Sequence, residues 1–216
     1  MAIEIRYAAL GLAQTNAYLV GDTDLKQALL IDPVDDAPLL QNMATEAGWT
    51  IRLIIATHAH FDHVLASSAL KAATGAPFYI HEEAVPMLKR LPDQGLRFIG
   101  QPFPEAAEPD RLLTSAKESL ELGAIRLETL YTPGHAPGHI ALYMPAQGIV
   151  FSGDALFAGS VGRTDLPGGD HDLLMRSIFD QLLTLPDETT VLPGHMDSTT
   201  IGRERTTNPY ILSYER

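Results

Sequence analysis

One stretch constrains the fold of this chain more than any other: Thr57-His58-Ala59-His60-Phe61-Asp62-His63. It follows the apolar run Leu53 to Ala56, which has the pattern of a strand buried on both faces. Crowding three imidazoles and a carboxylate into a surface loop is unfavourable, because protonation of one histidine disfavours protonation of the next. A divalent cation instead uses all of these groups as lone-pair donors. The stretch therefore predicts a metal site at the end of a buried strand.

Composition excludes several kinds of site and partner. The 216 residues include no cysteine, so a disulfide framework, a thiol nucleophile and a cysteine-bearing zinc site are all excluded. Any metal must therefore bind nitrogen and oxygen ligands. The 15 basic and 27 acidic side chains give a formal charge of -12, which disfavours nucleic acid as a partner because its non-specific binding depends on Lys and Arg.

No segment predicts targeting or membrane insertion. The N-terminal residues lack the basic start and apolar stretch of a signal peptide, and no window approaches the roughly 18 apolar residues that a membrane span requires. We expect one domain over residues 1–216, in the cytoplasm and without a membrane partner. The oligomeric state is not indicated.

The first half of the chain predicts strands that alternate with helices. Aliphatic and β-branched runs predict strands at 3–10, 15–21, 27–32, 51–56 and 77–81. Apolar periodicity predicts helices at 37–47, 63–74 and 82–90. Residues 91–111 contain four prolines and little periodicity, which predicts a long irregular connection over the site.

The second half repeats the mixed content. Strand pairs are expected at 119–122 with 125–131 and at 140–144 with 148–152, followed by a helix at 172–183 and a strand at 189–192. Successive β-helix-β passes indicate an α/β fold in which helices cover sheets.

Three later turns repeat the layout of the opening stretch: a strand ends, a Gly or Pro turn follows, and His135, Asp154 or His195 comes next. Ligands bind at the carboxyl ends of strands in α/β sheets, so the four turns can converge. The candidate ligands are then His58, His60, Asp62, His63, His135, Asp154 and His195. This set is too large for one tetrahedral zinc and fits two ions that share a carboxylate and a water.

These motifs resemble those of the metallo-β-lactamase superfamily, in their order and over essentially the whole chain. The resemblance implies an αββα four-layer sandwich, with two mixed sheets, helices on the outer faces and a dinuclear site in one edge cleft. It also implies how the ligands are divided. One ion would bind His58, His60, His135 and Asp154, and the other Asp62, His63, His195 and Asp154.

Within the superfamily, the stretch from Phe151 to Asp170 is similar to that of short bacterial glyoxalase II-like hydroxyacylglutathione hydrolases. This resemblance implies hydrolysis of a small anionic thioester, such as S-lactoylglutathione, by a metal-bridging hydroxide. The ions are expected to be zinc, with iron or manganese as alternatives, and the catalytic residues are expected to be His58, His60, Asp62 and Asp154. Longer glyoxalase II enzymes add a helical C-terminal domain that binds glutathione. We expect no such domain here, so the thiol carrier is left open.

Several residues are expected to support the site. Arg163 lies in a Gly-rich loop and either binds a substrate carboxylate or forms a salt bridge with Asp165 or Asp170. Asp32 and Thr57 are candidates to hold a ligand imidazole from behind.

The other histidines are expected to have lesser roles. His139 is expected to support the site or to pack beside it, because Pro137 excludes a helical pair with His135. His81 is expected to be a surface or capping residue, and His171 to begin a helix.

Other reactions remain open on the same residues. Persulfide dioxygenases share the fold and use a single iron, which here would bind His58, His135 and Asp154. Activity as a β-lactamase is less favoured, because the familiar zinc β-lactamases have no aspartate at the position of Asp154. A nuclease is disfavoured by the acidic composition.

Overall fold

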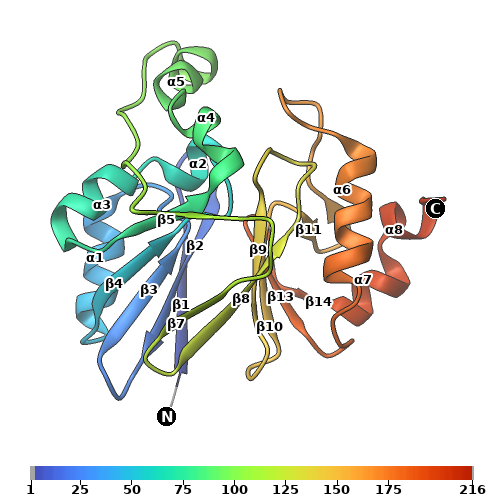
Figure 1. Ribbon diagram of the computed structural model, residues 1–216, viewed down its shortest axis with the longest axis horizontal. Helices are drawn as coiled ribbons and strands as arrows, with labels where there is room; N and C mark the ends of the chain where they lie inside the picture. Colours follow the sequence, from blue (N-terminus) through green and yellow to red (C-terminus); the bar gives the residue numbers. More distant parts are fainter. Residues whose placement is uncertain (1–2, 216) are drawn as a thin grey trace.

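Two six-stranded sheets lie face to face in this protein, whose computed structural model describes residues 3–215 (Figure 1). The first sheet has the order β1 (Ile3–Leu10), β2 (Thr15–Asp22), β3 (Gln27–Ile31), β4 (Thr50–Ile55), β5 (Phe78–His81), β6 (Arg111–Leu113). The second has the order β14 (Thr199–Thr200), β13 (Thr190–Pro193), β10 (Ile149–Gly153), β9 (Ile140–Met144), β8 (Ile125–Tyr131), β7 (Ser119–Leu122). A small hairpin joins β11 (Leu156–Phe157) to β12 (Ser160–Val161).

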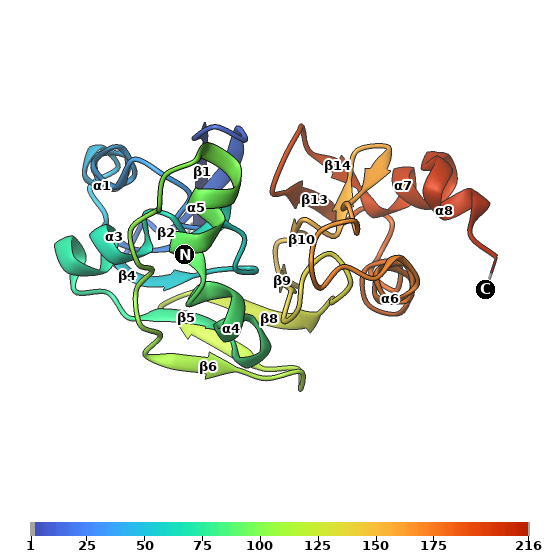
Figure 2. The same ribbon diagram turned by 90° about the horizontal axis from the view of Figure 1, so that it is seen from above.

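Helices cover the outer faces of both sheets. Those associated with the first sheet are α1 (Ala37–Glu46), α2 (Phe61–Val64), α3 (Ser67–Thr74), η1 (Glu82–Ala84), α4 (Val85–Leu88) and α5 (Leu91–Ile99). Those of the second are α6 (His171–Ser177), the π-helical η2 (Ile178–Leu182), α7 (Ile201–Thr207) and α8 (Pro209–Ser213). Figures 1 and 2 show α1 and α3 on the outer side of the first sheet and α6, α7 and α8 on the outer side of the second. The αββα sandwich is therefore confirmed.

The apolar residues form three cores, which separate the four layers. Within β3, Leu29 and Ile31 pack between the two sheets, whereas Ala28 and Leu30 pack under the outer helices. Successive strand side chains point to opposite faces, so a strand that is buried on both faces must be apolar at every position. This requirement explains the apolar runs at 28–31 in β3 and 53–55 in β4.

The turns that follow β4, β8, β10 and β13 converge because these strands end at one edge of the sandwich. β10 and β13 run parallel, so their carboxyl ends lie side by side. Asn16 and Tyr18 of β2 connect the sheets at this edge, since the Asn16 amide and the Tyr18 hydroxyl both donate to the Pro193 carbonyl oxygen, at 3.0 and 2.7 Å. The first sheet therefore holds the turn of the second that leads to His195.

Two sequence expectations about helices were wrong. The expected helix at 63–74 is divided into α2 and α3, and the break is stabilised where the Ala66 amide donates to the Pro33 carbonyl oxygen at 3.0 Å. The expected irregular connection at 91–111 begins with α5, because Pro92 lies in the first turn, where its missing N–H is tolerated. No described helix is long and apolar enough to cross a membrane.

Replacement of Leu142 by alanine tests the core between the sheets. Leu142 is completely buried there, whereas Leu212 on α8 is 62% exposed. We expect Leu142→Ala to lower the free energy of unfolding by about 2–5 kcal/mol, and Leu212→Ala to change it by less than about 0.5 kcal/mol. Urea unfolding with a chelator present measures the free energy of unfolding of both variants without a contribution from bound metal. Equal effects of the two substitutions would contradict the assigned core.

Candidate metal centre

Three histidines from two turns form the first ligand group. The Nε2 atom of His58 lies 3.0 Å from Nδ1 of His60, which lies 2.8 Å from Nε2 of His135. His58 and His60 follow β4, two residues apart in the same turn, and His135 follows β8. Three ring nitrogens at one point can hold one tetrahedral ion and leave its fourth position open.

A second group lies beside the first. The Asp62 Oδ2 atom is 3.6 Å from Nε2 of His63 and 3.3 Å from Nε2 of His195. These three side chains also have ligand atoms close enough to hold an ion together. The opening stretch of the sequence thus contributes to both groups.

Asp154 lies between the two groups. Its Oδ2 atom is 3.5 Å from His135 Nε2 and 3.3 Å from His195 Nε2, and its Oδ1 atom is 3.4 Å from His63 Nε2. The carboxylate therefore reaches histidines of both groups, as a bridging ligand must. Gly194 makes this approach feasible, because a Cβ atom there would overlap with Asp154 Oδ1.

Two unpaired atoms indicate that the residues fit a cation. His63 Nε2 and Asp154 Oδ1 are buried, lie 3.4 Å apart and form no hydrogen bond within residues 3–215. A buried polar atom without a partner is costly. Nδ1 of His63 donates to Asp32 Oδ2 at 2.8 Å, so Nε2 is the ring nitrogen that faces the site. A divalent ion would satisfy both atoms, and the N/O donor set suits the binuclear centre expected from the sequence.

Asp32 and Thr57 hold the histidines from behind. Asp32 accepts hydrogen bonds from the amide and the hydroxyl of Thr57, at 2.7 and 3.0 Å, in addition to the bond from His63. The Thr57 hydroxyl also lies 3.0 Å from His58 Nδ1. Asp32 has a φ of 56°, in the left-handed region that Asp tolerates better than most residues. One carboxylate therefore orients ligands of both groups.

His139 supports Asp154 through the backbone. Its Nε2 atom accepts a hydrogen bond from the Asp154 amide at 3.0 Å, and its Nδ1 atom lies 2.8 Å from the Thr132 hydroxyl. Burial lowers the pKa of His139 well below its usual value, so the ring is neutral and keeps an acceptor lone pair. The residue lies behind the ligands rather than among them.

The site favours metal binding to different degrees in its two groups. Burial, followed by repulsion from His135, lowers the pKa of His60 to about 3, so its lone pair is free at neutral pH. Burial also opposes a charge on His195, but the carboxylates of Asp154 and Asp62 outweigh it and raise its pKa to about 10. Burial likewise opposes a charge on His63, but the carboxylates of Asp154, Asp32 and Asp62 raise its pKa well above the usual value. A cation in the second group must therefore displace protons from both His195 and His63.

The Arg163 side chain forms the salt bridge that the sequence left open. Its guanidinium donates to both carboxylate oxygens of Asp165, at 2.7 and 2.8 Å. Its carbonyl oxygen lies 2.8 Å from Nδ1 of His135 and fixes that ring. Asp170 instead caps α6 by accepting from the Leu173 amide. A role of the Arg163 side chain in substrate binding stays a prediction.

His81 and His171 lie outside both ligand groups. His81 caps η1 by accepting from the Glu83 amide, but its surface placement was wrong because Tyr131 stacks on it and the side chain is completely buried. His171 begins α6 and is exposed.

Sequence reasoning missed two residues that support the site. The Thr15 hydroxyl donates to Asp62 Oδ2 at 2.7 Å, and Asn16 Nδ2 donates to the Met196 carbonyl oxygen beside His195. Asn is uncommon within strands, so Asn16 in β2 was a detectable signal. Thr15 is an ordinary strand residue and gave no such signal.

An αββα sandwich with two adjoining His/Asp groups at one edge defines a class of metal-dependent hydrolases. A family model described as the metallo-beta-lactamase superfamily matches residues 10–195, and the chain belongs to this superfamily.

Known relatives share nearly the full length. The chain is 39% identical over 201 residues to hydroxyacylglutathione hydrolase GloC of Haemophilus influenzae, covering 93% of this chain and 94% of the relative. The structure of BLEG-1 B3 metallo-beta-lactamase has a TM-score of 0.90 at 40% identity, covering 96% and 99% of the two chains. TTHA1623 in a di-iron-bound form has a TM-score of 0.85 at 41% identity, covering 95% and 99%.

Replacement of Asp32 by asparagine tests the support of the ligands. Asparagine removes the charge that orients His63, so we expect the affinity for the ion in the second group to fall by about 10- to 100-fold. Competition with a chromophoric chelator measures both affinities. Asp172→Asn, on an exposed aspartate, is the matched control. Unchanged affinities in a correctly folded Asp32→Asn protein would exclude the proposed role.

Proposed function

We propose that this protein is a glyoxalase II-like hydrolase that cleaves small acyl thioesters at a two-ion centre. The position of Asp154 carries the proposal, because a carboxylate that reaches both ligand groups is the bridge that a two-ion hydrolytic site requires. Similarity to GloC, over nearly the whole length of both proteins, supports the thioester as the bond that is cleaved.

Each side chain has a separate task in this reaction. Divalent cations, when bound, lower the pKa of water and polarise a carbonyl group. Neutral His58 and His60 offer lone pairs in a buried setting. Although burial opposes it, attraction to His63 lowers the pKa of Asp62 to about 2, so this carboxylate stays ionised and can accept a hydrogen bond from the attacking water.

The leaving group explains why the site needs no strong general acid. A thiol ionises near pH 8.5, so a thiolate departs without a proton from the protein. Cations bound by these residues would also make the cleft locally positive within a chain of net charge -12. That local field favours an anionic thioester, such as S-lactoylglutathione.

Oxidation of a persulfide is the alternative reaction. A single iron would need two histidines and one carboxylate, which His58, His135 and Asp154 can supply. The relative TTHA1623 was solved with two irons, so iron alone does not distinguish the reactions. The number of ions and the consumption of oxygen distinguish them.

Hydrolysis of β-lactams is a second candidate activity. A protein 40% identical to this chain, with a TM-score of 0.90, is described as a B3 metallo-beta-lactamase. Residues that would hold two ions for attack of water on a thioester carbonyl would also suit attack of water on a strained amide carbonyl.

Metal content and three assays on one preparation test the proposal. We expect about two divalent ions per chain, release of thiol from S-lactoylglutathione, loss of activity with a chelator and recovery with zinc. Oxygen consumption on glutathione persulfide and turnover of a chromogenic β-lactam are measured in parallel. A single iron with oxygen consumption would favour the dioxygenase, and a metal-replete protein that hydrolyses no thioester would refute the leading proposal.

A further inference from the structure

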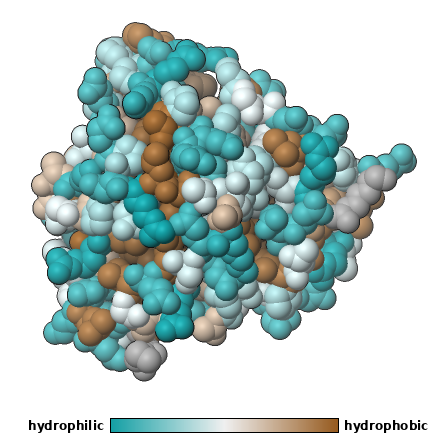
Figure 3. All heavy atoms as spheres, in the orientation of Figure 1, coloured by the Kyte–Doolittle hydropathy of each residue, from teal (hydrophilic) through white to brown (hydrophobic). Residues whose placement is uncertain are grey.

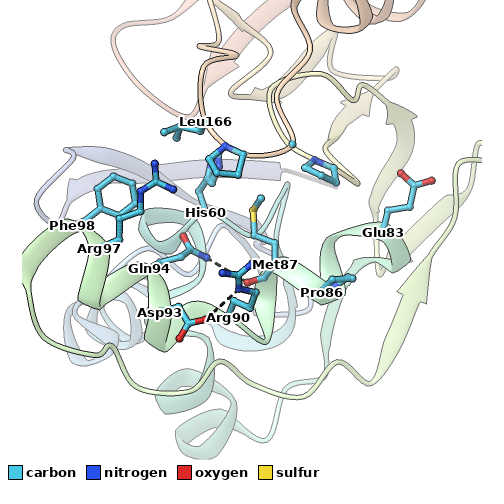
Figure 4. A pocket seen from close by; sticks show the side chains of 13 residues that line it. His60, Glu83, Pro86, Met87, Arg90, Asp93, Gln94, Arg97, Phe98 and Leu166 are labelled. Atoms are coloured by element: carbon cyan, nitrogen blue, oxygen red, sulfur yellow. Dashed lines mark hydrogen bonds and ion pairs between the residues drawn. The ribbon is translucent and has the colours of Figure 1, made fainter.

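A cleft of about 420 Å³ adjoins the candidate metal centre at His60 (Figure 4). Residues of α4 and α5 form one wall, and Pro137 with residues 166–168 forms the other. Figure 3 shows apolar side chains at the outer end of this region, where Leu96, Phe98 and Ile99 of α5 are about half exposed. The cleft falls within the size range of small-molecule sites and is larger than a small acyl group requires.

The α5 wall is fixed to the metal-binding turn. Gln94 Oε1 accepts from the Phe61 amide at 2.9 Å, and Gln94 Nε2 donates to the Ala59 carbonyl oxygen at 3.0 Å. The Phe98 and Phe61 ring centroids are 5.2 Å apart. A group that binds to α5 is thereby held at a defined position relative to His60.

The charged residues of the cleft differ in whether they already have partners. Glu83 accepts a hydrogen bond from the Tyr131 hydroxyl, and Arg90 pairs with Asp93 at 3.2 Å. Arg97 is exposed and forms no ion pair with any carboxylate in residues 3–215. Its guanidinium lies over the Phe98 ring, 6.0 Å from the centroid, and is the cleft's cation that none of these carboxylates neutralises.

The cleft is also asymmetric. Figure 4 shows Arg97, Phe98 and Leu166 toward one end and Glu83 and Pro86 toward the other, with His60 between them. A ligand with a carboxylate would therefore place that end at Arg97 and its apolar segment along the cleft wall.

On the basis of the proposed thioesterase function, we propose that this cleft binds the thiol carrier of the substrate and that Arg97 binds a carboxylate of that carrier. A guanidinium offers two parallel donors to a carboxylate, which gives both affinity and orientation. The class of substrate is then an acyl thioester of a small, carboxylate-bearing thiol. Such a carrier would be recognised by α5 without an additional helical domain.

Two thioesters that differ only in charge test this role of Arg97. We compare S-lactoylglutathione with its diethyl ester, in which both carboxylates are masked, in wild type, Arg97→Gln and Arg97→Lys. Arg97→Gln is expected to raise KM for S-lactoylglutathione about 10- to 100-fold, because a charged hydrogen bond is lost, and to leave kcat within about twofold of wild type. KM for the diethyl ester should be unchanged, and Arg97→Lys should recover part of the loss.

Lys89→Gln is the matched control. It also removes one positive charge, but Lys89 is exposed at the end of α4 and lines a different depression of the surface. A general effect of net charge would change KM equally in Arg97→Gln and Lys89→Gln. Equal changes in these two variants, or equal effects of Arg97→Gln on the acid and the diethyl ester, would overturn the proposal.

Binding of S-propylglutathione, a thioether that cannot be hydrolysed, separates this inference from the reaction itself. Calorimetry is expected to show binding to wild type that weakens at least about tenfold in Arg97→Gln. If no thioester is hydrolysed, the proposed reaction fails, yet this loss of binding would still establish the role of Arg97. Equal binding by the two proteins, or no binding by wild type, would overturn it.

Discussion

Burial of polar atoms that no hydrogen bond satisfies is the constraint on which this site depends. Within residues 3–215, His63 Nε2 and Asp154 Oδ1 form no hydrogen bond, and their burial is costly unless a cation binds to them. The surrounding structure maintains that arrangement, because Asp32 fixes His63 and His139 fixes the backbone of Asp154. The two sheets therefore serve to hold polar groups in positions that they would not adopt alone.

The same rigidity extends from the metal centre to the cleft. Gln94 binds the turn that contains the first ligands, so α5 and those ligands move together. Asn16 binds the turn that precedes His195, which connects the second sheet to the first. The α5 wall of the cleft and the candidate ligands from both sheets are thereby held in one frame, as orientation of a substrate for attack would require.

Most of the fold could be predicted, because buried strands and amphipathic helices leave periodic patterns. The first three strands and α1 were located to within about a residue, which is the accuracy that such boundaries allow. The errors occurred where tertiary contacts overrode the local pattern. The Ala66 amide bonds to Pro33 and separates α2 from α3, and α5 forms in a proline-rich segment that packs on Phe61.

The sequence by itself determined which residues could bind metal, because histidine and aspartate at strand ends have few other uses when crowded and buried. Its β-helix-β passes also indicated an α/β fold with helices covering sheets, and the order of the four layers followed from the family resemblance. Only the tertiary structure decided how close Asp154 comes to the histidines of each group, that Arg163 pairs with Asp165 rather than Asp170, and that Arg97 forms no ion pair within residues 3–215. The distances from Asp154 join residues far apart in the chain, about which local spacing carries no information, and local spacing allowed Arg163 more than one partner.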